Sequence, residues 1–238
     1  MKKILITGGT GGIGASCIKA FADGTNQIAF TYNQSYDQAR ILENEFNAIP
    51  IKADLSNIEQ AKETAATALA ELGGIDILIN NAGASHIGLF NELSDEEWQY
   101  LLNINLSSSI LLTREISREM IRNHNGRIIN IGSVWGRCGA SCEVAYSATK
   151  SALRGFTMAL AKELGPSGIT VNCVEPGVIN TKMNRCFDSE TLRSLADETP
   201  LCRIGEPDEV ASLVKFLSSD EAAFITGQCI GIDGGFGL

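Results

Sequence analysis

Short apolar runs alternate with helical stretches along almost the whole chain, and this alternation restricts the possible folds more than any other feature. The expected strands cover residues 3–7, 27–32, 48–53, 75–79, 126–131, 168–174 and 228–232. The expected helices cover residues 15–22, 57–72, 95–123, 144–164 and 207–217, with one more ending at Phe46. Continuously apolar strands separated by helices indicate a parallel sheet that is covered on both faces. We therefore predict an α/β fold with a doubly wound, seven-stranded parallel sheet, whose functional residues lie at the carboxyl ends of the strands.

A glycine-rich turn, Gly8-Gly9-Thr10-Gly11-Gly12-Ile13-Gly14, follows the first strand and leads directly into the first helix. In this context backbone N–H groups and the helix N-terminus cradle a pyrophosphate. Two registers of the dinucleotide fingerprint fit, one on Gly9, Gly11 and Gly14 and the other on Gly8, Gly12 and Gly14. Both registers place the phosphates at the same helix start. The run predicts a dinucleotide site, because a merely tight turn needs fewer glycines.

The end of the second strand bears on the choice of dinucleotide. An Asp or Glu at this point binds the ribose 2′-hydroxyl of NAD, whereas this chain has Tyr32-Asn33-Gln34-Ser35. An end without an acid tolerates a 2′-phosphate, so NADP(H) is favoured over NAD(H), although no Lys or Arg stands there to hold the phosphate. Asp37 comes later and is expected in the first turn of the next helix, where it complements the helix dipole.

Polar residues also follow the third and fourth strands, as Asp54-Leu55 and Asn80-Asn81-Ala82-Gly83. Two amides followed by a glycine can hold neighbouring strand ends together and leave room for a ring. The helix expected over residues 95–123 begins with Ser94 and Glu97, which have the spacing of a capping box. It contains Asn105, which is unfavourable in a helix interior, and this hints at a specific use of the side chain.

Tyr146 and Lys150 are the residues of the expected helix 144–164 that carry chemistry. Positions four apart lie on the same helix face, so the phenol and the ammonium can point into one pocket. A free tyrosine titrates near ~10, and a fixed positive charge beside it lowers that pKa and makes proton exchange with a substrate oxygen feasible. Such a pair is common by chance on solvated helices, so its interpretation depends on the rest of the chain.

Composition excludes several kinds of partner. The formal net charge of −9 argues against nucleic acid or an anionic membrane surface, because both are polyanions. No stretch approaches the roughly 18 apolar residues of a membrane span, and the apolar run after Met1 is cut by Thr7 and the glycines. The 238 residues include only 5 prolines and no linker or low-complexity stretch, which indicates a single domain.

The seven cysteines are scattered and odd in number, which favours reduced thiols in the cytoplasm over a disulfide framework. Cys138 and Cys142 stand four apart, but no His or second Cys pair completes a zinc site with them. The two histidines, His86 and His124, lie elsewhere in the sequence. We therefore predict no metal.

The motifs together resemble the short-chain dehydrogenase/reductase family over essentially the whole chain. TGGTGGIG, ADL, NNAG, NINL, IGS, YSATK and PG occur in the family order and spacing. The stretches EPDEVASLVKFLSSDEAAF and ITGQCIGIDGGF are most similar to the 3-oxoacyl-[acyl-carrier-protein] reductase branch. The resemblance implies one Rossmann domain over residues 1–238, with a dinucleotide-binding half over 1–90 and a catalytic and substrate-binding half over 91–238.

The resemblance also implies roles for particular residues. Tyr146 would donate a proton to the carbonyl oxygen, and Ser133 would hydrogen-bond that oxygen. Lys150 would lower the pKa of Tyr146 and hold the nicotinamide ribose, while Asn105 would keep a proton-relay water in line. The implied dinucleotide-binding residues are Gly8, Gly9, Thr10, Gly11, Gly12, Ile13, Gly14, Tyr32, Asn33, Asp54, Leu55, Asn81, Ala82, Gly83, Tyr146, Lys150, Pro176, Gly177, Ile179 and Thr181.

For the substrate, the resemblance implies NADPH-dependent reduction of a ketone, with a 3-oxoacyl group on an acyl carrier or a small-molecule ketone as first choice. Arg127 matches a basic residue that carrier-protein reductases use near the mouth of the site, but Ser167 occupies the place of another. The alternatives are a hydroxysteroid, a sugar, a ketone on a modified lysine of elongation factor P, or a dinucleotide-binding regulator without catalysis. The segment 180–201 is expected to cover the substrate, and the family resemblance implies a homotetramer.

Overall fold

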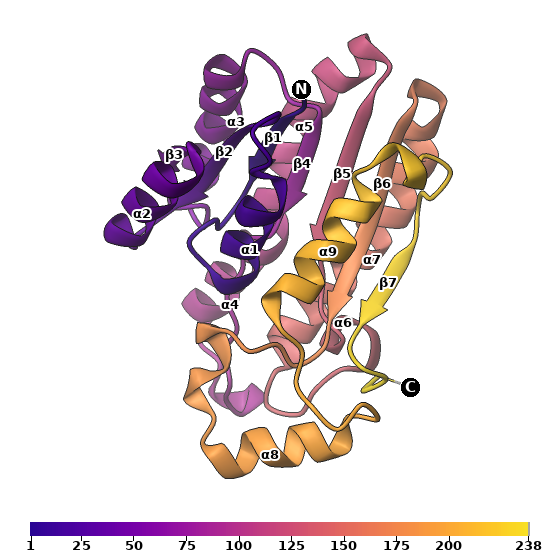
Figure 1. Cartoon of the computed structure of the whole chain (residues 1–238). Helices are drawn as coiled ribbons and strands as arrows, with labels where there is room; N and C mark the ends of the chain where they lie inside the picture. The colour runs from indigo at the N-terminus through magenta and orange to yellow at the C-terminus, as the bar shows by residue number, and fades with distance from the viewer. Residues whose placement is uncertain (238) are drawn as a thin grey trace.

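A single seven-stranded parallel sheet forms the centre of the molecule (Figure 1). The computed structural model describes residues 1–237, apart from the side chains of Arg185 and Cys186. The strands are β1 (Lys3–Ile6), β2 (Gln27–Tyr32), β3 (Ile49–Lys52), β4 (Ile77–Asn80), β5 (Gly126–Ile131), β6 (Ile169–Pro176) and β7 (Cys229–Ile232). Their order is β3-β2-β1-β4-β5-β6-β7, and every neighbouring pair is parallel. The predicted α/β fold is confirmed.

Helices connect the strands as the alternation predicts. They are α1 (Gly12–Phe21), α2 (Tyr36–Phe46), α3 (Ile58–Leu72), α4 (Asp95–Leu102), α5 (Ser108–Asn123), α6 (Trp135–Cys138), α7 (Val144–Leu164), α8 (Ser189–Glu198) and α9 (Pro207–Leu217). Short 3₁₀ segments lie at Phe90–Glu92, Gly165–Ser167, Lys182–Cys186 and Asp220–Ala222. The bounds of α7 agree with the prediction. None of the described helices is long and apolar enough to cross a membrane.

The helix predicted over residues 95–123 is divided in the structure. The capping box of Ser94 and Glu97 starts α4 as expected, but residues Asn103–Ser107 form a π-helical turn before α5 begins. The predicted helical region 95–123 is therefore confirmed, and the π-helical turn within it is a feature that the sequence did not predict. The break surrounds Asn105, and π-turns inside helices are frequent at functional sites.

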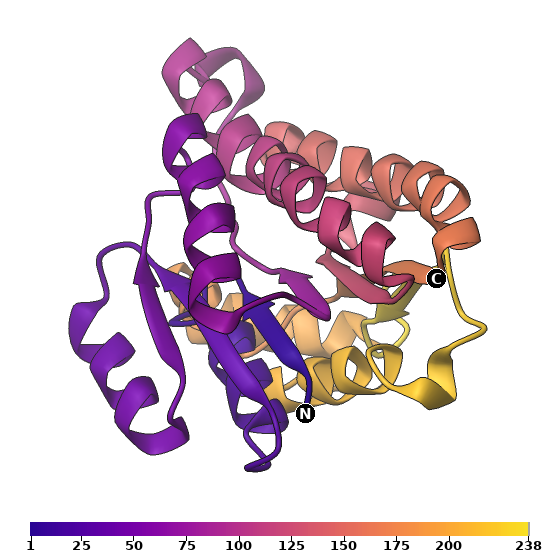
Figure 2. The same ribbon diagram turned by 90° about the horizontal axis from the view of Figure 1, so that it is seen from above.

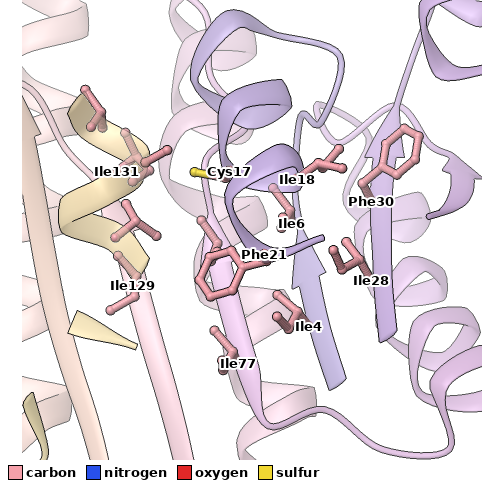
Figure 3. Close-up of a cluster of buried hydrophobic side chains, with 14 of the residues drawn as sticks. Ile4, Ile6, Cys17, Ile18, Phe21, Ile28, Phe30, Ile77, Ile129 and Ile131 are labelled. Atoms are coloured by element: carbon pink, nitrogen blue, oxygen red, sulfur yellow. The ribbon is translucent and has the colours of Figure 1, made fainter. Parts of the chain in front are cut away.

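Alternate residues of the strands point to opposite faces of the sheet, so two separate hydrophobic cores form, one on each face. Ile4 and Ile6 of β1 face one side and pack with Ile18 and Phe21 of α1 and with α9 (Figure 3). Leu5 faces the other side and packs among residues of α3, α5 and α7. Figure 2 shows the resulting three layers, with helices above and below the sheet. Burial on both faces explains why the strands are continuously apolar in the sequence.

The sheet order places a topological switch between β1 and β4. The chain proceeds outward from β1 through β2 to β3, and then returns to β4 and proceeds in the opposite direction. Loops that leave the carboxyl ends of β1 and β4 therefore diverge and open a crevice, which is where ligands bind in sheets of this kind. In Figure 1, α8 lies beyond these carboxyl ends.

Candidate active site

The glycine turn after β1 is closed too tightly for side chains at its critical positions. Gly8 has a φ of +66°, which favours glycine. A Cβ on Gly14 would lie 2.3 Å from the Gly8 carbonyl oxygen, and a Cβ on Gly12 would lie 2.8 Å from the Thr181 side chain. The turn therefore brings bare backbone to the start of α1, as a pyrophosphate cradle requires.

Gly9 has a different function from the other glycines of the turn. A Cβ at this position would lie 2.5 Å from the Phe30 ring, so Gly9 allows the turn to pack against β2. Gly8, Gly12 and Gly14 line the cavity at the switch point, whereas Gly9 does not. This geometry favours the register on Gly8, Gly12 and Gly14. The contact of Gly9 with the dinucleotide stays a prediction.

A cavity of about 1100 Å³ extends from the glycine turn along the carboxyl ends of the strands. All expected dinucleotide-binding residues except Gly9 line it: Gly8, Thr10, Gly11, Gly12, Ile13, Gly14, Tyr32, Asn33, Asp54, Leu55, Asn81, Ala82, Gly83, Tyr146, Lys150, Pro176, Gly177, Ile179 and Thr181. At the far end of β2, Gln34 and Ser35 also line the cavity, and Asp37 lies in the first turn of α2 as predicted.

Hydrogen bonds join the ends of β1 and β4 beside this cavity. Thr7 Oγ1 accepts from the backbone N–H groups of Asn81 at 2.8 Å and Ala82 at 2.9 Å. Asn81 Nδ2 donates to the carbonyl oxygens of Thr7 at 2.8 Å and Gly8 at 3.1 Å. The neighbouring Asn80 is buried and donates to Asn130 Oδ1 at 2.9 Å. The prediction that the paired amides hold strand ends together is confirmed.

Ser133, Tyr146 and Lys150 meet on one wall of the cavity. Ser133 lies directly after β5, where its Oγ accepts from the Trp135 backbone N–H at 3.1 Å, and its side chain hydrogen-bonds Tyr146. Lys150 Nζ donates to the Ile131 carbonyl oxygen at 2.8 Å and lies 5.7 Å from the centre of the Tyr146 ring. One face of α7 and one strand end thus bring a hydroxyl, a phenol and an ammonium together.

The pKa of Tyr146 departs in the direction opposite to the expectation. Burial raises it to about 12, the hydrogen bond from Ser133 opposes that shift, and the Glu143 carboxylate adds to it. Burial lowers the pKa of Lys150 to about 8. Desolvation disfavours both charged forms and is the largest cause of both shifts. The phenol is consequently protonated at any ordinary pH, which suits a proton donor.

The Asn105 side chain forms two hydrogen bonds with the backbone of the loop after β4. Its Oδ1 accepts from the Ala84 N–H at 2.9 Å, and its Nδ2 donates to the Ala84 carbonyl oxygen at 2.9 Å. A Cβ on Gly83 would lie 2.8 Å from Asn105 Oδ1 and 3.3 Å from Lys150 Nζ, so Gly83 leaves room for both side chains. Asn105 therefore positions this loop against Lys150. Its expected part in holding a proton-relay water stays a prediction.

The segment 180–201 begins beside the glycine turn, where Thr181 lies against Gly12, and continues along the cavity through α8. That it covers the substrate stays a prediction. Thr191, Leu195 and Glu198 of α8 face the cavity, joined by Met183 and Phe187 before the helix. No residue of α8 is buried, although Thr199 directly after it is. This side of the cavity is therefore bordered by a helix that is only weakly packed against the rest of the molecule.

Two site features differ from the sequence-based interpretation or were missed by it. Arg127 is buried at the amino-terminal end of β5, opposite the cavity, and lies near Asp220. Its expected place at the mouth of the site is wrong for a single chain, because a residue that begins a strand lies at the other edge of the sheet. Glu143 was missed; it lines the cavity next to Tyr146, and burial raises its own pKa.

Comparisons with known proteins agree with this geometry. The sequence model of a family described as Enoyl-(Acyl carrier protein) reductase matches residues 8–237. A 3-oxoacyl-[acyl-carrier-protein] reductase of Synechocystis sp. is 38% identical over 97% of this chain and 95% of its own. A short-chain dehydrogenase/reductase from Serratia marcescens superposes with a TM-score of 0.93 at 34% identity, over 100% of this chain and 98% of its own.

A further structure, a blue fluorescent protein from a metagenomic library in complex with NADPH, also has a TM-score of 0.93 at 34% identity, over 100% of this chain and 98% of its own. These similarities extend over the glycine turn at 8–14, over the catalytic wall formed by Ser133, Tyr146 and Lys150, and over the segment 180–201, which we call the cover. The chain belongs to the short-chain dehydrogenase/reductase family and is an NAD(P)-dependent oxidoreductase that acts on carbonyl or alcohol groups.

Proposed function

We propose that the protein reduces a ketone to a secondary alcohol with NADPH, and that its substrate is a 3-oxoacyl thioester. The observation that carries the proposal is the meeting of Ser133, Tyr146 and Lys150 on one cavity wall beside the glycine cradle. The bare backbone at Gly8, Gly12 and Gly14 fits a dinucleotide pyrophosphate, because added Cβ atoms at Gly12 and Gly14 would collide with neighbouring atoms.

The proposed division of labour follows from the contacts. Ser133 accepts a hydrogen bond from Trp135, and its own O–H, which hydrogen-bonds Tyr146 in the free protein, turns to the substrate carbonyl oxygen when substrate binds. Tyr146, protonated because of its raised pKa, gives its proton to the same oxygen. Lys150, held by the Ile131 carbonyl, orients the ribose and resupplies the proton. Asn105 acts as a positioning residue by fixing the loop at Gly83 and Ala84.

The dinucleotide supplies the hydride for the carbonyl carbon when bound. The chain's own contribution is alignment and proton delivery, since the C=O bond gains one hydride at carbon and one proton at oxygen. Preference for NADPH is supported by the cavity lining at the end of β2, where Tyr32, Asn33, Gln34 and Ser35 offer no carboxylate to repel a 2′-phosphate.

The 3-oxoacyl thioester is supported by the printed name of the Synechocystis relative and by the apolar side chains near the cover, such as Phe187 and Leu195. A second substrate class is favoured by Glu143. This carboxylate is half-buried beside Tyr146 and makes no side-chain hydrogen bond or ion pair within the described part of the chain. A ketone that carries a positive charge, such as one on a modified lysine, would give Glu143 a partner.

The test is a panel of carbonyl substrates, each assayed with NADPH and with NADH. The panel contains 3-oxoacyl thioesters on acyl carrier protein and coenzyme A, an amine-bearing ketone, a keto-steroid and a keto-sugar. We expect the highest kcat/KM for a thioester and at least tenfold tighter binding of NADPH than of NADH, a difference of about 1.4 kcal/mol.

Glu143→Gln separates the two substrate classes. If the proposal is right, this variant should reduce the thioester with a kcat/KM within a few-fold of the parent value. Higher kcat/KM for the amine-bearing ketone, lost in Glu143→Gln, would replace the thioester with the second class. Equal affinity for the two dinucleotides would contradict the NADPH preference.

We also propose a homotetramer in the cytoplasm. Apolar side chains that a monomer leaves exposed support association. They are Val144 and Met158 on α7, Phe216 on α9 and Phe224 in the segment before β7. The cysteines that the structure describes are all free, in keeping with a reducing compartment. A monomer mass by light scattering at micromolar concentration would contradict the tetramer.

A further inference from the structure

Three side chains with metal-binding chemistry lie together between α7 and the β6–β7 edge of the sheet. They are Cys173 and Glu175 of β6 and Cys229 of β7, and their two sulfurs and a carboxylate oxygen all lie within 4.8 Å of one another. Cys173 and Cys229 face each other directly, because they are register partners on neighbouring parallel strands. These three residues do not line the cavity of the active site.

Glu175 is the feature of this cluster that calls for a ligand. The residue is only 1% exposed, and Arg154 of α7 pairs with its Oε1. The other oxygen, Oε2, is buried and has no hydrogen-bond partner. Burial of a carboxylate oxygen without a partner is costly, so a further positive group at this point would stabilise the cluster.

We propose that Cys173, Glu175 and Cys229 bind a thiophilic divalent cation of the zinc type. Zinc takes thiolate and carboxylate ligands at about 2.3 and 2.1 Å, which places two sulfurs of one tetrahedral site about 3.8 Å apart. The present separations of 4.8 Å or less therefore need a contraction of about 1 Å or less at each pair.

The charges also fit a divalent ion. Two thiolates and one carboxylate carry three negative charges, which the Arg154 guanidinium and one divalent cation neutralise together. Arg154 then holds the carboxylate oxygen that is not needed by the metal, as hydrogen-bond partners of ligating carboxylates commonly do. Cys229 is only partly buried, so an ion can reach the cluster from solvent, and a water would complete the four ligands.

The cluster lies directly behind the catalytic wall. A Cβ on Gly132 would lie 2.8 Å from Cys173 Sγ, and Gly132 precedes Ser133. Arg154 stands one helical turn after Lys150 on α7. An ion at this site would cross-link β6, β7 and, through Arg154, α7. It would thereby hold the backbone that presents Ser133 and Lys150.

Cobalt is the probe for the test, because thiolate ligands give Co²⁺ a charge-transfer absorption that zinc lacks. The full chain is reduced, freed of metal with a chelator, checked for free thiols and titrated with Co²⁺. We expect a thiolate-to-cobalt band that saturates at one ion per chain and disappears when Zn²⁺ is added. Added Zn²⁺ should also raise the melting temperature, since it binds only the folded site.

The variants make the assignment specific. Cys229→Ser should abolish the band and the zinc-dependent rise in melting temperature, and Glu175→Gln should weaken Co²⁺ binding at least tenfold. The double variant Cys138→Ser/Cys202→Ser, which removes two exposed thiols outside the cluster, is the matched control and should bind as the parent does.

If Cys229→Ser does not fold by circular dichroism, Cys173→Ala serves the same purpose. Absence of a band at one equivalent of Co²⁺ in the parent would overturn the proposal. So would a band that persists in Cys229→Ser or disappears in the double control, because the ligands would then be other cysteines.

Discussion

The glycine turn at 8–14 and the helix α8 within the cover at 180–201 both line the same cavity, but they do so by different physical means. The turn is made of backbone in close contact, where even one added Cβ at Gly14 would lie 2.3 Å from another residue's carbonyl oxygen. The cover is a helix with no buried residue that presents side chains such as Leu195 to the cavity. The proposed dinucleotide site is therefore shaped by closely packed main chain, whereas the proposed substrate cover is shaped by side chains and can adapt more easily.

The largest effect should follow from a substitution in the glycine turn. Gly14→Ala puts a methyl group against the Gly8 carbonyl and the Asn81 side chain. Overpacking of this kind costs about 1–3 kcal/mol, so we expect the dissociation constant for NADPH to rise about 10- to 100-fold. Isothermal titration measures it.

Gly155→Ala is the control for this substitution, because an added Cβ there meets nothing within 4 Å and the helix should tolerate it. NADPH binding by Gly14→Ala within twofold of the parent would show that the turn is not closely packed. The contrast between the two regions would then fail.

Lys150 lines the cavity that the two regions share, and the loss of its proton predicts that kcat/KM depends on pH. Its pKa is lowered to about 8 by burial, so the ammonium is lost as the pH rises through that value, while Tyr146 with a pKa of about 12 keeps its proton. In the reduction direction, kcat/KM for NADPH, which reports the free enzyme, should fall up to about tenfold per pH unit above about pH 8. Steady-state assays over this range measure it.

In Lys150→Arg the guanidinium stays charged, so any residual activity should lose the alkaline fall. A parent profile that stays flat until the protein unfolds would contradict the low pKa of Lys150. The same fall in Lys150→Arg would assign it to another group.

The smallest effect is expected in the cover. Leu195→Ala removes apolar surface from the cover, so KM for a long-chain 3-oxoacyl thioester should rise by about tenfold or less. NADPH affinity should stay unchanged. Leu192→Ala is the matched control, because it makes the same change on the same helix without lining the cavity. A loss of NADPH affinity in Leu195→Ala would show that the two regions are coupled.

The same contrast explains which parts of the molecule were predictable from sequence. The strands, the bounds of α7 and the cradle follow from apolar runs and glycine positions, which depend on local backbone physics. The π-turn around Asn105 was not predictable, because the side chain forms its hydrogen bonds with Ala84, which is distant in sequence. Gly9 looked like its neighbours, and only the packing of Phe30 gives it a separate function.

The electrostatics of the site could not be predicted from spacing. Tyr146 and Lys150 stand four positions apart, which predicts a lowered tyrosine pKa, but burial dominates and raises it. The cluster of Cys173, Glu175 and Cys229 was equally hidden. Its members come from strands that are more than fifty residues apart along the chain and meet only through sheet pairing.

The central claim, that Tyr146 delivers the proton, is tested most directly by Tyr146→Phe assayed with saturating NADPH and the best ketone of the panel. The variant removes the hydroxyl but keeps the buried ring, so folding and NADPH binding should persist while kcat falls by about 10²–10⁴-fold or more. Tyr100→Phe makes the same change at another tyrosine that lines the cavity and should keep its activity within a few-fold. A folded, NADPH-saturated Tyr146→Phe that still turns over within a few-fold of the parent would contradict the account.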